Sequence, residues 1–213
     1  MRLRRETIVR EALALVDERG LDSLTVRRLA EQLDVQNPAL YRHFESKQDL
    51  LDSMAETMMS DGFAPLEPPT PQETWDVWLA RLARVFRQVM LSHRDGARII
   101  AGARLSQRGL LLGLDQALQL LQGHGFEPAM AFHAIRTVFD YTLGSVFEEQ
   151  ADQLRSSARI ESVQRVNETE PLPALMAALG EIARRDQAGE AAEGFEAGLQ
   201  FIIAGLRATN GAP

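Results

Sequence analysis

Eight residues within a short N-terminal stretch carry side chains that could contact nucleic acid. They are Arg27, Gln36, Asn37, Ala39, Tyr41, Arg42, His43 and Lys47. An arginine can bind guanine through two hydrogen bonds, an asparagine can bind adenine, and an alanine methyl can meet the methyl of thymine. Tyrosine hydroxyls, lysines and helix N-terminal amides usually bind phosphates. The same set would also suit the solvated face of a helical hairpin that only packs, so its meaning depends on how the chain positions it.

The pattern around these residues predicts two short helices joined by a tight turn, over residues 25–44. Thr25 is a good N-cap for a helix over 25–33. Asn37 and Pro38 predict an N-cap followed by proline at the first position of a helix over 38–44. In a helix-turn-helix, the second helix presents its N-terminal residues to the major groove. The spacing therefore favours DNA binding over a hairpin that merely packs.

The rest of the chain is also expected to be helical, because no useful stretch alternates apolar and polar residues with period 2. Further helices are expected over 4–19, 47–60, from 70 onwards, 97–103, 107–122, 127–154, 174–185 and 191–208. Thr70-Pro71-Gln72-Glu73 combines an N-cap, a proline and a capping-box glutamate, which places a helix start at residue 70. Residues 155–173 are expected to form a mobile loop. The fold class is all-α.

A proline-rich linker and a charge asymmetry suggest two domains. Residues 62–71 hold four prolines in ten positions. Residues 1–47 have a net charge of +1, and the remaining residues have a net charge of −8, which together give the total of −7. Only the first part is therefore suited to binding a polyanion. We expect a DNA-binding domain over 1–47 and a second domain over 48–213, with the helix over 47–60 connecting them.

Composition excludes several other classes of protein. The 213 residues are 45% hydrophobic and 25% charged, as in soluble globular proteins. The sequence contains no cysteine, which excludes disulfides, thiolate catalysis and cysteine-bound zinc. No signal peptide or membrane-spanning segment is recognisable, so a cytoplasmic location without membrane association is expected. Gly194, Gly198 and Gly205 in the last helix indicate either close approach of another backbone, such as a dimer partner, or loose internal packing.

Longer motifs resemble a known family. The stretch LDSLTVRRLAEQLDVQNPALYRHFESKQDLLDSM resembles the DNA-binding domain of the tetracycline-repressor (TetR) family of transcriptional regulators. The segments MLSHRDGARI, GHGFEPAMAF and FDYTLGSVFEEQ are similar to the effector domain of the tetracycline repressors. The resemblance implies an all-helical homodimer with about ten helices, which binds double-stranded operator DNA and a small-molecule effector. Helices 8 and 10 of both chains would form the dimer interface.

The resemblance also implies roles for individual residues in DNA binding. Arg27 would contact a base. Thr25, Tyr41, His43 and Lys47 would hold phosphates. Asn37, Pro38 and Ala39 would begin the recognition helix. Asp34 stands where the family usually has glycine in the turn, and aspartate tolerates the left-handed conformation that such a turn needs.

The implied effector pocket departs from the tetracycline repressors. Ile100 replaces the histidine that binds the magnesium carried by the drug, Phe63 and Leu82 replace polar drug contacts, and Asp140 replaces a histidine. Isoleucine offers no atom that could bind magnesium. We therefore expect no metal or cofactor, and a larger apolar or aromatic effector instead of tetracycline–magnesium. The pocket candidates are Phe63, Leu82, Phe86, Ile100, Arg104, Gln116, Phe132, Ile135, Asp140 and Glu148.

An enzyme is the main alternative class, and the sequence disfavours it. The histidines at 43, 93, 124 and 133 are scattered, and no HExxH, GxSxG or Walker motif occurs. His93 is expected in a cap or salt bridge, and His133 is expected to be either a hydrogen-bonded or a surface histidine of its helix. A second alternative is a family member that no longer binds DNA, and the presence of Arg27, Tyr41 and Lys47 argues against it.

Overall fold

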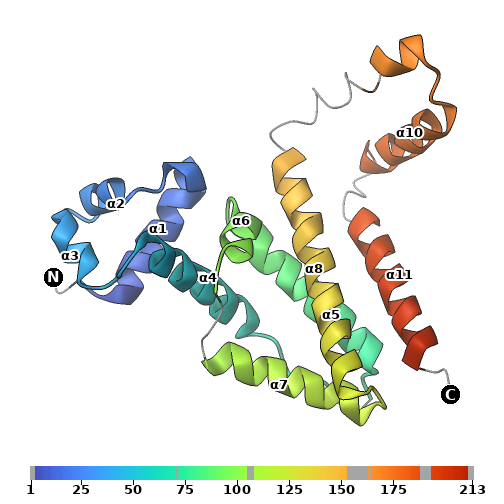
Figure 1. Ribbon diagram of the computed structural model, residues 1–213, viewed down its shortest axis with the longest axis horizontal. Coiled ribbons are helices and arrows are strands. Elements are labelled where there is room, and N and C mark those ends of the chain that lie inside the picture. Colours follow the sequence, from blue (N-terminus) through green and yellow to red (C-terminus); the bar gives the residue numbers. More distant parts are fainter. Residues whose placement is uncertain are drawn as a thin grey trace.

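A computed structural model describes residues 3–70, 72–104, 108–152, 163, 165–187 and 193–210. The secondary structure of these residues is helical throughout, as the sequence predicts (Figure 1). The elements are α1 (Arg5–Arg19), a 3-10 turn η1 (Leu21–Ser23), α2 (Val26–Gln32), α3 (Asn37–Tyr41), α4 (Lys47–Phe63), α5 (Trp75–Leu91), α6 (Gly96–Ala101), α7 (Arg108–Gly123), α8 (Pro128–Asp152), α10 (Pro173–Gln187) and α11 (Glu193–Asn210).

The first three helices pack at one end of the molecule, and α4 leads from them into the larger helical body (Figure 1). Helix α1 buries Ile8, Ala12 and Val16 completely. It ends at Gly20, whose φ of +81° suits glycine and whose amide donates to the Val16 carbonyl at 2.7 Å. This confirms the stop that the sequence predicts. The group formed by α1, α2, α3 and the first turn of α4 is called the head below, and α5–α11 the body.

Helix α5 lies at the centre of the body and packs against α4, α6, α8 and α11. Its buried residue Met90 belongs to a core that extends from α1 through α4 to α6. Leu79, further along the same helix, belongs to a second core shared with α7, α8 and α11. Phe63 and Phe139 pack against both cores. The head is therefore connected to the body by continuous apolar packing, which transmits strain because protein interiors are close-packed.

Helix α11 runs beside α8 and is tied to α5 by ion pairs (Figure 1). Arg84 binds Glu196 through two hydrogen bonds of 2.7 Å, and Arg207 binds the buried carboxylate of Asp76. A Cβ atom at Gly198 would lie 2.1 Å from the Tyr141 hydroxyl, so this glycine admits a side chain of the same chain. Gly194 and Gly205 have no such neighbour within 4 Å. The close approach expected at the glycines is thus internal at Gly198.

Two local predictions for the body are wrong. Helix α5 begins at Trp75, with Thr74 as N-cap, and not at residue 70. The Glu73 carboxylate accepts hydrogen bonds of 3.0 and 2.7 Å from Arg81, which occupies the side chain expected to act in a capping box. The expected loop over 155–173 contains helical residues 165–169, while 153–162 and 164 lie outside the described residues.

No helix in the described ranges is both long enough and apolar enough to span a membrane.

Candidate nucleic-acid interface and effector site

The turn between α2 and α3 is built from three local interactions. The Thr25 hydroxyl caps α2 by accepting a hydrogen bond of 3.2 Å from the Arg28 amide, as predicted. Asp34 has a φ of +53°, which confirms that aspartate takes the left-handed position here. The Val35 amide donates to the Ala30 carbonyl at 3.0 Å and closes the turn. The two short helices therefore meet at a fixed angle without a glycine.

Helix α3 differs from the prediction at both ends. It begins at Asn37, because Gln36 has the extended backbone of an N-cap, so Asn37 is not the cap. Pro38 lies in the first turn, where its missing amide costs no helical hydrogen bond. The helix ends at Tyr41 and not at residue 44, since the amides of His43 and Phe44 both turn back to the Leu40 carbonyl, at 2.9 and 3.1 Å.

The DNA-contact candidates form an outward-facing set on the head. The family resemblance implies a role in DNA binding for eight residues. Two of these eight, Ala39 and His43, are partly buried, and the other six are exposed. The exposed ones are Thr25, Arg27, Asn37, Pro38, Tyr41 and Lys47. Tyr41 is 58% exposed. The structure therefore brings these residues together on the surface of α2, α3 and the start of α4.

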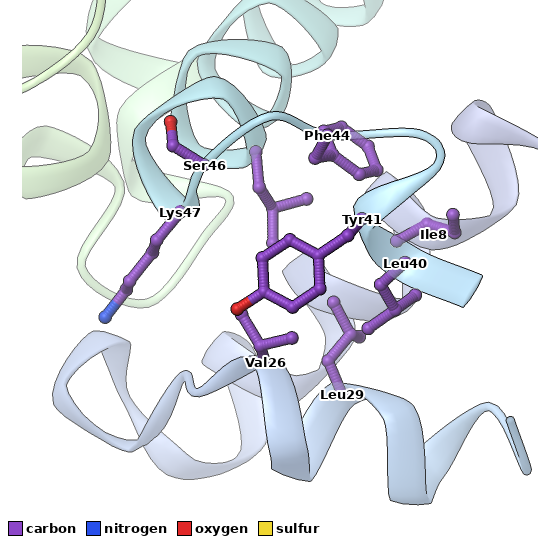
Figure 2. A pocket seen from close by; sticks show the side chains of 9 residues that line it. Ile8, Val26, Leu29, Leu40, Tyr41, Phe44, Ser46 and Lys47 are labelled. Atoms are coloured by element: carbon purple, nitrogen blue, oxygen red, sulfur yellow. The ribbon is translucent and has the colours of Figure 1, made fainter. Parts of the chain in front are cut away.

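Figure 2 shows how Tyr41 and Lys47 lie at this surface. The Tyr41 ring borders a shallow apolar hollow that is also lined by Val26, Leu29 and Phe44. The phenol oxygen lies at the Val26 side of this hollow, and the Lys47 ammonium group extends away from it (Figure 2). The Tyr41 ring thus lies against apolar side chains, and Lys47 projects from the same part of the surface; hydroxyl and ammonium groups of this kind suit contact with phosphates.

Arg27 is already paired in the free protein. Its Nε donates to Glu31 at 2.9 Å, one helical turn away, and the Arg27 side chain is 82% exposed. The hydrogen bond and the charge of Glu31 raise the pKa of Arg27 above its usual value. A nucleic acid that binds Arg27 must therefore compete with Glu31 for the guanidinium group.

The apolar pocket candidates lie inside the body. Leu82, Phe86, Ile100 and Ile135 are each at most 7% exposed. The Phe86 ring stacks on Phe139 with centroids 4.4 Å apart. The Phe63 ring at the end of α4 lies 6.4 Å from the Phe86 ring. Within the described residues, these side chains fill the core between α4, α5, α6 and α8.

The polar pocket candidates lie at the surface, apart from this apolar group. Arg104, Gln116, Asp140 and Glu148 are exposed. Asp140 accepts a hydrogen bond of 3.3 Å from Arg136 on its own helix. Phe132 is 43% exposed as well. The single chain thus brings the apolar candidates together and leaves the polar ones and Phe132 outside them. In the described ranges, no three His, Cys, Asp or Glu side chains are arranged to hold a metal ion.

Sequence reasoning missed a polar contact between α4 and the end of α6. Gln48 donates to the Gly102 carbonyl at 2.8 Å, and Asp52 accepts from the Arg104 amide at 3.0 Å. Gln48 also donates to Asp52 at 2.8 Å. Gln48 and Asp52 lie four residues apart, so they share one face of α4. This spacing in the sequence could have suggested a pair, but not its backbone partners. We call these two residues the α4 clamp.

A second polar contact joins the end of α1 and η1 to the turn before α6. Asp17 accepts hydrogen bonds from the Arg94 amide at 2.9 Å and lies 3.0 Å from the His93 ring nitrogen. Asp95 accepts from the Leu21 amide at 2.8 Å. Arg98 pairs with both Asp95 and Asp22. The His93 ring therefore contacts an acidic side chain, as a salt bridge would require, and this partner lies in the head.

Comparisons with known proteins agree with this architecture. The family model of bacterial regulatory proteins of the tetR family matches residues 8–54, and the model of the tetracyclin repressor-like C-terminal domain matches residues 67–210. The chain is 40% identical over 205 residues to the class A tetracycline repressor of transposon 1721 from Escherichia coli, covering 96% of this chain and 91% of that protein. The chain belongs to the TetR family of transcriptional regulators. It is a DNA-binding regulator with a ligand-binding C-terminal domain and not an enzyme.

Solved TetR-family structures share the fold along the whole chain. A TetR variant from Acinetobacter baumannii AYE in complex with minocycline is 36% identical, with a TM-score of 0.77 over 99% of this chain and all of that chain. ActR from Streptomyces coelicolor in complex with actinorhodin is 27% identical, with a TM-score of 0.78 over 99% and 98%. BioQ with its double-stranded DNA operator is 25% identical, with a TM-score of 0.67 over 97% and 99%. Members of this fold therefore bind DNA and different small molecules.

Proposed function

We propose that this TetR-family regulator is a homodimeric repressor that a small-molecule effector other than tetracycline–magnesium releases from a palindromic operator. The exposed face of α3, with Tyr41 and Lys47 beside it, is the observation that carries the proposal. The DNA-binding domain would comprise residues 1–47 and the effector-binding and dimerisation domain residues 48–213, connected by α4. A dimer would place two α3 helices one DNA turn apart on a palindromic site. Binding to chromosomal operators would place the protein in the cytoplasm.

The DNA contacts divide by chemistry. Arg27 would bind a base edge, and Asn37, Pro38 and Ala39 would enter the major groove at the start of α3. Thr25, Tyr41, His43 and Lys47 would hold phosphates. Six of these eight residues are exposed and thus accessible to DNA. A base contact affects only matching sequences, whereas a phosphate contact contributes to binding of any duplex.

Binding to duplexes tests these assignments. A duplex would first be selected from a random library by the unmodified protein, and its affinity measured by fluorescence anisotropy beside a scrambled duplex. Arg27→Ala should weaken binding of the selected duplex and leave binding of the scrambled duplex almost unchanged. The difference in binding free energy between the two duplexes should therefore fall by about 1–3 kcal/mol. Lys47→Ala should weaken both and reduce the slope of log affinity against log salt by about 1 per protomer. Equal losses on both duplexes for Arg27→Ala would contradict its role.

The dimer interface would use α8 and α11, which correspond to the eighth and tenth expected helices. Phe201 on α11 is 77% exposed and Phe147 on α8 is 43% exposed. Gly144 and Gly205 have no atom of the chain outside their own helices within 4 Å, which leaves room for a second backbone. Exposed aromatic rings beside small residues suit a helix–helix interface.

Analytical ultracentrifugation tests the interface with a matched pair of variants. Phe201→Glu should shift the protein from dimer to monomer, because it would bury a charge between the two chains. Leu111→Glu on α7, where the leucine is 54% exposed, should leave the dimer intact. Dissociation by Leu111→Glu alone would move the interface to α7.

The effector would bind beside α5, α6 and α8. Phe63, Leu82, Phe86, Ile100 and Ile135 would offer apolar contacts. Phe132, Arg104, Gln116, Asp140 and Glu148 would complete and orient the ligand at the surrounding surface. The residues present do not fit a drug that carries magnesium, because Ile100 is a hydrocarbon at the position of the metal-binding histidine. A larger apolar or aromatic ligand suits these side chains better.

Calorimetric titration with tetracycline plus magnesium chloride tests the effector assignment. We expect no saturable heat with protein that is folded and binds the selected duplex. A signal of micromolar affinity or tighter would overturn the proposed effector class and restore a tetracycline-responsive repressor.

Effector binding would be transmitted to DNA through α4. The α4 clamp binds the backbone of Gly102 and Arg104, two to four residues beyond Ile100, and Gln48 directly follows Lys47. A shift at the end of α6 would therefore move the start of α4 and change the spacing of the two heads. The effector must bind the released conformation better, and DNA must then weaken effector binding by the same factor.

A further inference from the structure

The Arg5 side chain contacts several residues of the segment that follows α3. One terminal nitrogen of its guanidinium donates to the His43 carbonyl at 2.5 Å. The other donates to the Asp49 carboxylate at 2.5 Å and to the Ser53 hydroxyl at 2.7 Å. The guanidinium also lies over the Phe44 ring, 4.3 Å from its centroid. The first residue of α1 therefore binds the α3–α4 connection at His43 and Phe44, together with the first two turns of α4.

Asp49, which Arg5 binds, also forms hydrogen bonds to the residues that connect α3 and α4. Its second carboxylate oxygen accepts a hydrogen bond of 3.0 Å from the Glu45 amide. Its own amide donates to the Ser46 hydroxyl at 3.1 Å, so Ser46 is the N-cap of α4. Burial opposes ionisation of Asp49, but the hydrogen bonds from Arg5 and the Glu45 amide outweigh it and lower the pKa of this carboxyl. Asp49 is thus held as an anion between Arg5 and the backbone.

We propose that Arg5 is a positioning residue for DNA binding, which fixes residues 43–49 through the His43 carbonyl and the Asp49 carboxylate. This inference rests on the proposed DNA-binding function. The segment carries His43 and Lys47 and begins two residues after Tyr41, and these three residues are proposed phosphate contacts. An unconstrained connection would have to lose conformational entropy when DNA binds. A planar guanidinium can hold both acceptors at once, which the single ammonium group of lysine cannot reproduce.

Removing the charge of Asp49 changes DNA affinity in opposite directions for a positioning role and for simple charge repulsion. Removing an anion near DNA strengthens binding if charge repulsion is all that matters. If Asp49 acts with Arg5 to fix the segment, removing its charge weakens binding instead. Glu45 provides the matched control, since it is an exposed carboxylate within the same segment.

The first experiment measures affinity of the full-length protein for the selected duplex by fluorescence anisotropy at several salt concentrations. Arg5→Lys and Asp49→Asn should each weaken binding about tenfold, and Glu45→Gln should leave it unchanged or tighter. The double variant should bind about as weakly as either single variant, because the two residues act as one unit. The salt slope should stay that of the unmodified protein. Full affinity of Arg5→Lys, tighter binding by Asp49→Asn, or a slope reduced by about 1 per protomer would overturn the proposal.

The second experiment needs no DNA. Amide hydrogen exchange of the peptide containing residues 43–49 should become faster in Arg5→Lys, while a peptide from α8 should be unchanged. Unchanged exchange in residues 43–49 would overturn the positioning role, whatever DNA the protein binds. Faster exchange with unaltered affinity would show that the fixed segment does not matter for DNA. Failure of the unmodified protein to select any duplex from the random library would overturn the proposed function. Hydrogen exchange that still depends on Arg5 would distinguish this outcome from a failure of the positioning role.

Discussion

The head and the body present their candidate residues in opposite ways. On the head, six of the eight DNA-contact candidates are exposed and lie on one surface of α2, α3 and the start of α4. In the body, Leu82, Phe86, Ile100 and Ile135 are buried in the core. A DNA partner approaches the head from outside, whereas an effector would contact side chains that also stabilise the fold. Substitutions in the two regions should therefore have different consequences.

The largest expected effect on stability comes from the body. Phe86 is 3% exposed and stacks on Phe139, so Phe86→Ala should lower the free energy of unfolding by about 3–5 kcal/mol. Tyr41→Ala on the head, where the ring is 58% exposed, should change it by less than about 1 kcal/mol and yet weaken DNA binding strongly. Urea unfolding at one fixed protein concentration, together with duplex binding, measures both quantities. Similar stability losses in the two variants would remove the contrast between the regions.

A glycine beside the effector candidates should give the next largest effect. A Cβ atom at Gly96 would lie 2.1 Å from the Met90 carbonyl oxygen, so Gly96→Ala should cost about 1–3 kcal/mol by displacing the start of α6. Gly113 on α7 has no atom outside its own helix within 4 Å. Gly113→Ala should instead stabilise the protein by about 0.5–1 kcal/mol, because alanine favours a helix. Thermal unfolding of both variants checks the opposite signs, and a loss in Gly113→Ala would point to a neighbour from a second chain.

The sequence predicted the head more completely than the body for a physical reason. The Thr25 cap and the left-handed Asp34 depend on side chains within a few residues, so local rules were sufficient. The predicted start of α5 was wrong because Glu73 binds Arg81, eight residues away on α5, instead of a nearby amide. Local patterns favour a cap but do not reveal a competing tertiary partner.

The remaining interactions depend on residues far apart in the chain. The Arg5 contacts join residues separated by 38–48 positions, and the α4 clamp binds backbone atoms 52 and 54 positions away. Every residue has a backbone carbonyl, so the sequence does not show which of them a side chain will bind. Helix periodicity could identify which side chains face the core, but it could not show that the polar effector candidates lie apart from the apolar ones. Folding determines that arrangement, and the proposed dimer would add further neighbours.

Acid should weaken the head through Asp49. Because Arg5 and the Glu45 amide lower the pKa of Asp49 in the folded protein, its ionised form stabilises the fold above the usual pKa near 4. This contribution should be lost as the pH falls through the lower folded pKa. Urea unfolding at pH 6 and at pH 3 should show a smaller acid-induced loss in Asp49→Asn than in the unmodified protein. Glu45→Gln serves as the control, and an equal acid-induced loss in Asp49→Asn and the unmodified protein would contradict the assignment.

The smallest expected effect concerns the ion pair that occupies Arg27 in the free protein. Glu31→Gln removes the carboxylate that accepts from Arg27 Nε at 2.9 Å and should raise affinity for the selected duplex by about twofold, since exposed ion pairs are weak. The gain should disappear when Arg27→Ala is also present, because the freed guanidinium is then missing. The scrambled duplex should gain less than the selected one, as Arg27 would contact a base. An equal gain on both duplexes and in both backgrounds would mean that Glu31 only repels DNA, and that the ion pair does not compete with base recognition.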